Sequence, residues 1–203
     1  MDFYNQLLAQ KLSGGGGGDI NAAFKALVDG SITEVTADML ESATSIKNFL
    51  FSETALTNIT IPNNITTIGI SAFNGCRNLT SIKIPNSITS ISSNTFSECT
   101  SLTSIEIPNS VTSINSQAFF KCSSLTSITI PNGVTQFGYY ALSYCSSLTS
   151  ATIEAISPPA AYNDLFRDSN RVVIYVPAES VDAYKAASGW STYADKIQAI
   201  PSE

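Results

Sequence analysis

A phrase of 23 residues recurs along the middle of the chain without insertion or deletion. Four full copies fill residues 56–147, and eight of the 23 positions are identical in all four. Each copy, and the start of a fifth, opens on a leucine, at Leu56, Leu79, Leu102, Leu125 and Leu148. Self-similarity at a fixed period is the signature of a repeat architecture in which each unit stacks on the next. We therefore expect a solenoid of stacked coils.

One copy, residues 102–124, indicates what a unit can form. Ile105 and Ile107 alternate with Glu106, as in a strand with one buried face. Pro108 ends the strand because proline has no N–H to donate to a neighbouring strand. Burial of the few apolar side chains in one unit does not offset the entropy lost when its backbone is ordered. A unit is therefore stable only where its neighbours share its apolar face and its backbone hydrogen bonds.

Cysteine returns with the same period, at Cys76, Cys99, Cys122 and Cys145. In-register strands lie ~4.8 Å apart, and side chains that point the same way keep their Cβ atoms beyond the ~3.5–4.5 Å of a disulfide. A straight row of sulfurs cannot converge on the tetrahedron that zinc requires. Free cysteine behaves as a small hydrophobe and is commonly buried. We therefore favour a structural ladder of reduced thiols over a disulfide or a metal site.

The repeat can be written LTSIxIPxxVTSIxxxAFxxC. In this form it resembles the leucine-rich repeats of the BspA or Treponema type, which occur in surface and adhesion proteins of bacteria, gut bacteria included. The resemblance covers residues 56–148. It implies a right-handed leucine-rich-repeat solenoid, mainly β, with a parallel sheet on one side and an irregular convex side. It implies protein or matrix binding only at the level of the family, because such repeats serve many roles.

The N-terminal segment differs from the repeats. Phe3, Leu7 and Leu8 lie on one face of a predicted short helix, and the glycines at 14–18 form a flexible tether. Residues 1–12 either fray or use this apolar face to attach the chain to a partner or to a second copy. The opening also resembles small structural proteins of phages and prophages of gut bacteria. It lacks the basic segment and apolar run of a secretory signal, so we expect a cytoplasmic protein or a component of a virion or particle.

The predicted organisation has four parts. They are a helix with its tether, an N-terminal cap with a degenerate unit, the repeats, and an α/β C-terminal cap, at residues 1–18, 19–55, 56–148 and 149–203. The periodicity stops after Ile156. Beyond it the pattern predicts a strand at 172–176, a helix from Pro177 or Glu179 to about Ala187, a stop at Gly189 and a helical turn from Trp190 to Ala194. This segment resembles the C-terminal caps of BspA-type proteins and would cover the open end of the last coil.

Composition argues against several classes of function. The chain has no histidine, which removes Ser–His and Cys–His nucleophile pairs and imidazole ligands. The net charge is −6 with only 13% charged residues, which leaves no basic face for a nucleic acid. Glu98 and Glu106, the acidic residues of the repeats, occupy different phases and cannot pair for glycoside hydrolysis. We expect a non-catalytic protein with no cofactor, metal, nucleic-acid partner or membrane span.

Two sets of residues are candidate surfaces for a protein or glycan partner. The members of the first set occupy the same exposed strand position in successive units and are Thr60, Lys83, Glu106 and Thr129. The second is aromatic and replaces the small or polar residues of other units, at Phe120, Tyr139, Tyr140 and Tyr144. Exposed aromatic residues are typical binding anchors, although the C-terminal cap can also fold over them, and we favour the latter. The expected function is a binding or adhesion module. The alternative is a structural component of a larger, phage-derived particle attached through residues 1–12.

Overall fold

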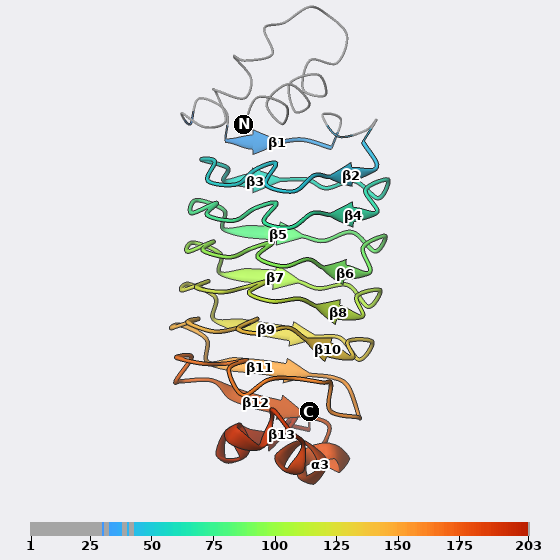
Figure 1. Cartoon of the computed structure of the whole chain (residues 1–203), viewed down its shortest axis with the longest axis vertical. Coiled ribbons are helices and arrows are strands. Elements are labelled where there is room, and N and C mark those ends of the chain that lie inside the picture. Colours follow the sequence, from blue (N-terminus) through green and yellow to red (C-terminus); the bar gives the residue numbers. More distant parts are fainter. Residues whose placement is uncertain (1–29, 31–32, 38–39, 41–42, 203) are drawn as a thin grey trace, which may run out of the picture.

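The computed structural model describes residues 30, 33–37, 40 and 43–202. These residues form a column of stacked coils in which every strand pair is parallel (Figure 1). Ser81 lies opposite Ser104, so the strand register equals the sequence period. The predicted leucine-rich-repeat solenoid is therefore confirmed. The predicted short helix that carries Phe3, Leu7 and Leu8 lies outside the described residues.

The strands form two columns that run along the solenoid. The first contains β1 (Glu34–Val35), β3 (Asn58–Ile59), β5 (Ser81–Lys83), β7 (Ser104–Glu106), β9 (Ser127–Ile130), β11 (Ser150–Ile153), β12 (Val173–Val176) and β13 (Ile197–Ala199). The second contains β2 (Ser45–Ile46), β4 (Thr67–Ile68), β6 (Ser90–Ile91), β8 (Ser113–Ile114) and β10 (Gln136–Phe137). In the first column, hydrogen-bonded ladders join β1 to β3, β5 to β7, and the four strands β9, β11, β12 and β13 in that order. In the second column they join β2 to β4, and β6, β8 and β10 in that order.

The interior is built from ladders of identical or similar side chains, one from each coil. The rings of Phe51, Phe73, Phe96 and Phe119 stack with centroids 5.4, 5.5 and 5.6 Å apart and planes within 11° of parallel. These rings are fully buried, as are the opening leucines of the repeat. Each apolar side chain thus packs on its counterpart from the next coil, which is why one unit alone has no core.

The four cysteines are buried free thiols. Each thiol donates a hydrogen bond to a phenylalanine carbonyl of the preceding coil, and Cys122 Sγ, for example, lies 3.1 Å from Phe96 O. Each of these carbonyls also accepts a backbone N–H of its own coil, for example the Cys99 N–H at 3.2 Å from Phe96 O, so the thiol is a second donor. The cysteine therefore fills space and adds a hydrogen bond between neighbouring coils.

The backbone between the second strand and the cysteine is a series of tight turns. Two positions per coil have positive φ, for example Asn94 (56°) and Glu98 (58°), although the left-handed region favours glycine. The N–H groups of these two residues donate to Ser116 O at 2.9 Å and Phe120 O at 2.7 Å in the next coil. This conformation directs the N–H groups along the stack, and the hydrogen bonds to the next coil offset its energetic cost.

The solenoid continues past the end of the sequence repeat. Leu165 O accepts from the Leu142 N–H at 3.0 Å, and Ser169 Oγ donates to Leu142 O at 2.9 Å, as the cysteines do to phenylalanine carbonyls. Residues 157–171 thus complete one more coil without the repeat motif. The stack therefore extends beyond Ile156, after which the sequence periodicity stops.

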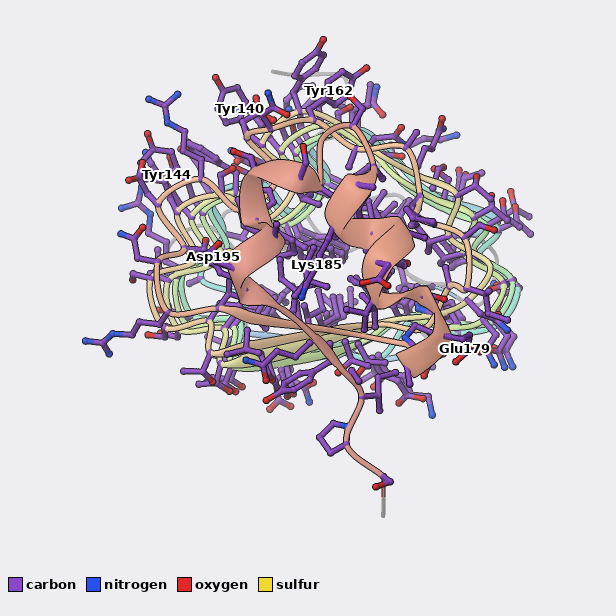
Figure 2. The ribbon with its side chains drawn as sticks, turned by 90° about the horizontal axis from the view of Figure 1, so that it is seen from below. Tyr140, Tyr144, Tyr162, Glu179, Lys185 and Asp195 are labelled. Carbon is purple, nitrogen blue, oxygen red and sulfur yellow. The ribbon has the colours of Figure 1, made fainter. Side chains whose placement is uncertain are left out.

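The C-terminal cap closes the column. After β12 come the 3₁₀ helix η2 (Ala178–Ser180), the helix α3 (Val181–Ala186), the 3₁₀ helix η3 (Ser191–Lys196) and β13. The predicted strand, helix and helical turn are confirmed to within about two residues, whereas β13 had no predicted counterpart. Seen along the column, the helices lie across the middle of the last coil (Figure 2). Tyr184 and Trp190 are fully buried there, so the cap shields the open end of the core.

We predict that the thiol hydrogen bond contributes measurably to stability. Cys122→Ala should lower the free energy of unfolding by about 0.5–1.5 kcal/mol, because Phe96 O would lose one of its two donors and keep only the Cys99 N–H. Cys122→Ser should cost less, since Ser169 already makes the equivalent bond. Urea unfolding followed by circular dichroism measures both values. Equal losses for the two variants would mean that the hydrogen bond contributes nothing.

We also predict a loss of stability in alkali. Burial raises the pKa of Cys76 to about 11 and of Cys145 to about 12, from an ordinary value of 9.0. The folded state favours the protonated thiol, so this stabilisation is complete below pH 9 and is lost as the pH rises through 11 and 12. Melting temperatures measured from pH 7 to 11 should fall above pH 9. A variant with serine at all four cysteine positions should show a clearly shallower fall, and an identical fall would contradict the assignment.

Candidate functional site

The first predicted surface lies on the outer face of the first strand column. A bridge pairs Thr60 with Lys83, and Lys83 lies opposite Glu106 in β7. Lys83 Nζ and Glu106 Oε2 are 3.8 Å apart, with the two side chains 79% and 72% exposed. Thr129 occupies the same strand position in β9 and lies opposite Thr152 in β11. This row is mostly hydroxyl groups with one solvent-screened ion pair, worth at most about 1 kcal/mol, and beyond Thr152 it continues to the half-buried Tyr175 in β12.

Three residues of the second predicted surface form an aromatic cluster, which we define as Phe120, Tyr140 and Tyr144. The Phe120 ring meets Tyr144 edge-on at 5.2 Å and Tyr140 at 6.5 Å between centroids. Lys121 Nζ lies 5.2 Å from the centre of the Phe120 ring, within reach of a cation–π contact. Edge-to-face packing fixes the rings relative to one another, so the cluster is a preformed feature of the surface.

The backbone of two coils positions this cluster. Tyr140 and Tyr144 occupy the two positive-φ positions of their coil, with φ of 58° and 59°. The Tyr144 N–H donates to Arg167 O at 2.7 Å, and the Tyr140 N–H to Asp164 Oδ1 at 3.3 Å. The same turn geometry that carries polar residues in earlier coils thus presents tyrosines here.

The C-terminal cap does not cover the tyrosines, and the prediction that it does is wrong. Tyr139 is 51% and Tyr144 36% exposed. Tyr140, Tyr144 and Tyr162 project from the rim of the last coils, away from the cap helices (Figure 2). The cap needs only to seal the apolar middle of the column, and its short helices do not reach the rim.

Charged groups surround the aromatic cluster and balance one another. The charge of Tyr144, followed by a hydrogen bond that Arg167 donates to Tyr140, raises the pKa of Arg167, which stays a cation throughout the physiological range. Glu98 bridges Arg77 at 3.1 Å and Lys121 at 3.3 Å along the same side. The surface therefore combines aromatic rings with charges of both signs.

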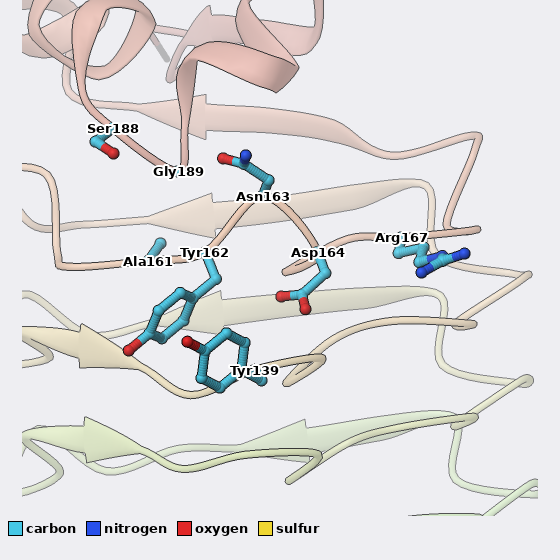
Figure 3. Close-up of a pocket in the computed structure, with 8 residues that line it drawn as sticks. All are labelled: Tyr139, Ala161, Tyr162, Asn163, Asp164, Arg167, Ser188 and Gly189. Atoms are coloured by element: carbon cyan, nitrogen blue, oxygen red, sulfur yellow. The ribbon is translucent and has the colours of Figure 1, made fainter.

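Tyr139 is not a member of the aromatic cluster and lines a pocket of about 500 Å³ (Figure 3). Its ring stacks on that of Tyr162, with centroids 3.7 Å apart and planes 21° from parallel. A hydrogen bond that Tyr139 donates to Tyr162, followed by the charge of Tyr162, raises the pKa of Tyr139. The remaining polar lining is contributed by Asn163, Asp164, Arg167 and Ser188.

Sequence reasoning selected Tyr139 but missed Tyr162, Asn163 and the role of Asp164. The 23-residue period does not point to Tyr162, because this coil contains one extra residue: Gln136 pairs with Ala160, 24 residues later, which makes Asn163 the counterpart of Tyr139. Tyr162 was overlooked because the surrounding segment has lost every identical position of the repeat. Tyr139 and Tyr140 are adjacent in sequence, and only the backbone geometry decides that they face different neighbours.

In the described residues, no three acidic or cysteine side chains come together as metal ligands. Over the same range, no helix has the length and apolar character needed to cross a bilayer.

Comparison with known proteins gives a family and related folds. The family described as "BspA type Leucine rich repeat region (6 copies)" matches residues 44–172. A leucine-rich repeat protein of T. pallidum aligns with a TM-score of 0.58 at 26% identity, covering 66% of this chain and 62% of that one. One from Bacteroides ovatus aligns with a TM-score of 0.51 at 22% identity, covering 72% and 47%. No curated protein matches the sequence.

The family match reaches beyond the regular repeats on both sides. It includes residues 149–172, where the structure completes a coil without the motif. The chain spans less than two thirds of the length of either structural relative. With a match over most of its length and the same solenoid fold, the chain belongs to the BspA-type leucine-rich repeat family.

Proposed function

We propose that this protein is a non-catalytic binding module that engages a protein or glycan partner through the tyrosine-rich rim of its C-terminal coils. The observation that carries the proposal is the concentration of partly exposed aromatic side chains there. The aromatic cluster and the pair Tyr139 and Tyr162 lie on neighbouring coils. The strand face, by contrast, presents mainly serine and threonine.

Rigid aromatic residues are the most common anchors of protein interfaces. They bury a large area on binding and lose little conformational entropy, because only two side-chain torsions must be fixed. Here that entropy is already reduced, since Phe120 holds both Tyr140 and Tyr144 edge-on. Stacked coils also form extended surfaces, which suit binding better than catalysis. The absence of histidine from the sequence points the same way.

A direct test replaces the three predicted tyrosines together, as Tyr139→Ser, Tyr140→Ser and Tyr144→Ser. Binding to a panel of extracellular-matrix proteins and immobilised glycans is measured by biolayer interferometry. The triple variant should lose at least about tenfold in affinity, as expected for hot-spot residues. Its melting temperature should stay within about 5 °C of the parent, because these side chains lie outside the core.

The matched control removes the strand-face ion pair through Lys83→Ser and Glu106→Ser. Both side chains are largely exposed, so this variant should keep its stability and its affinity. If the control loses binding and the triple variant keeps it, the binding surface is the strand face. Equal binding by all three proteins would contradict both surfaces.

Attachment through residues 1–12 is a separate proposal that rests on the sequence alone. If Phe3, Leu7 and Leu8 mediate self-association, the full chain should form oligomers and a chain starting at Asp19 should be monomeric. Light scattering coupled to size-exclusion chromatography gives both masses. Two monomers would exclude self-association and with it this route to assembly into a particle.

A further inference from the structure

We infer that the pocket between Tyr139, Tyr162 and the C-terminal cap binds a sugar residue of a glycan. The inference rests on the proposed binding function and assigns it a site and a ligand class. Four observations support it, namely how the pocket loop is held, how closely the cap approaches it, which ring faces are open, and which polar groups line it.

The loop that carries Tyr162 is fixed by polar atoms of the cap. Trp190 Nε1 donates to Pro159 O at 2.7 Å, and the Tyr184 hydroxyl donates to Ala155 O at 2.7 Å. The Tyr193 hydroxyl donates to Asn163 O at 2.5 Å and accepts from the Phe166 N–H at 3.0 Å. Apolar side chains would be enough to seal the column. These hydrogen bonds instead hold residues 155–163 in one conformation, so the pocket is preorganised.

The cap also approaches the loop as closely as backbone allows. Gly189 has a φ of 82°, and a Cβ at this position would lie 2.1 Å from Ala161 O. Only glycine permits this contact, which brings Ser188 and Gly189 to the wall of the pocket above Tyr162 (Figure 3). The cap is therefore part of the site as well as a seal for the core.

The stacked tyrosines provide a surface that suits the apolar face of a pyranose ring. Each ring uses one face against the other, and the side chains of Tyr139 and Tyr162 remain 51% and 43% exposed. Sugar C–H groups carry partial positive charge and pack on the electron-rich face of an aromatic ring. A single flat platform of this kind orients a sugar without enclosing it.

The polar lining matches the hydroxyl groups of a sugar. Each hydroxyl both donates and accepts, so it needs neighbours of both kinds. Asn163 offers an amide donor and acceptor, Asp164 accepts, and Arg167 donates. Asp164 and Arg167 have opposite charges, so neither an anion nor a cation is favoured. The volume of about 500 Å³ lies within the range of small-ligand pockets.

The lining also argues against a peptide side chain as the ligand. Apart from the two tyrosine rings, Ala161 is the one apolar side chain among the residues assigned to the pocket. An apolar peptide anchor would bury little hydrophobic area there and would leave polar groups unpaired. The aromatic cluster around Phe120 is the better surface for a protein.

The test uses the full chain and saturation-transfer difference NMR with free hexoses, N-acetylhexosamines and their disaccharides at millimolar concentration. At least one sugar should give a saturable signal that falls at least about tenfold in Tyr162→Ala and in Asn163→Ala. Tyr162→Phe should retain most of the signal, because it keeps the ring. Tyr175→Ala, on the strand face, is the matched control and should bind as the parent does.

Two outcomes would overturn the inference. One is the absence of a saturable signal from every sugar in the set, and the other is unchanged binding in both Tyr162→Ala and Asn163→Ala. If no sugar binds but a protein of the matrix panel still requires Tyr140 and Tyr144, the glycan site is wrong and the proposed binding function stands. If neither kind of ligand binds, both are wrong.

Discussion

The structure depends on hydrogen bonds between equivalent backbone groups of neighbouring coils. On the turn side these bonds require an unfavourable conformation. Within the described part of the chain, ten non-glycine residues have positive φ, at about 1–2 kcal/mol each. An isolated coil has this strain without the acceptors that the next coil provides. Stability therefore arises only from the stack, and a surface residue at such a position is held as firmly as a residue in a strand.

The same dependence explains why polar atoms occur inside the column. Each coil turns a phenylalanine carbonyl inward, and the cysteine of the following coil donates to it. Where the motif is lost, Ser169 takes over the donor role towards Leu142. The chemical requirement is thus a small side chain with one donor, and cysteine meets it with the least exposed polarity. A thiol that returns every 23 residues is a structural element rather than a reactive group.

The candidate sites lie where the repeat becomes irregular. Regular coils present mainly hydroxyl groups and a few screened charges. Near the C-terminal end, tyrosines replace the mostly polar residues of earlier coils at the positive-φ positions, and an aperiodic loop is held against the cap by Tyr184, Trp190 and Tyr193. Departures from local sequence rules tend to mark functional positions. The C-terminal cap accordingly both ends the core and shapes the surface beside it.

The sequence by itself determined the solenoid, the parallel register, the residues that face inward and the elements of the cap from β12 to η3. It could do so because a fixed period places identical side chains on top of one another, and apolar side chains then exclude water together. The tertiary structure alone decided that Tyr139 and Tyr140 face different neighbours and that the cap leaves the tyrosines exposed. It also decided that residues 157–171 form a coil. These features depend on hydrogen bonds between residues far apart in the chain, such as the one from Tyr193 to Asn163. The periodicity of the sequence does not predict such contacts.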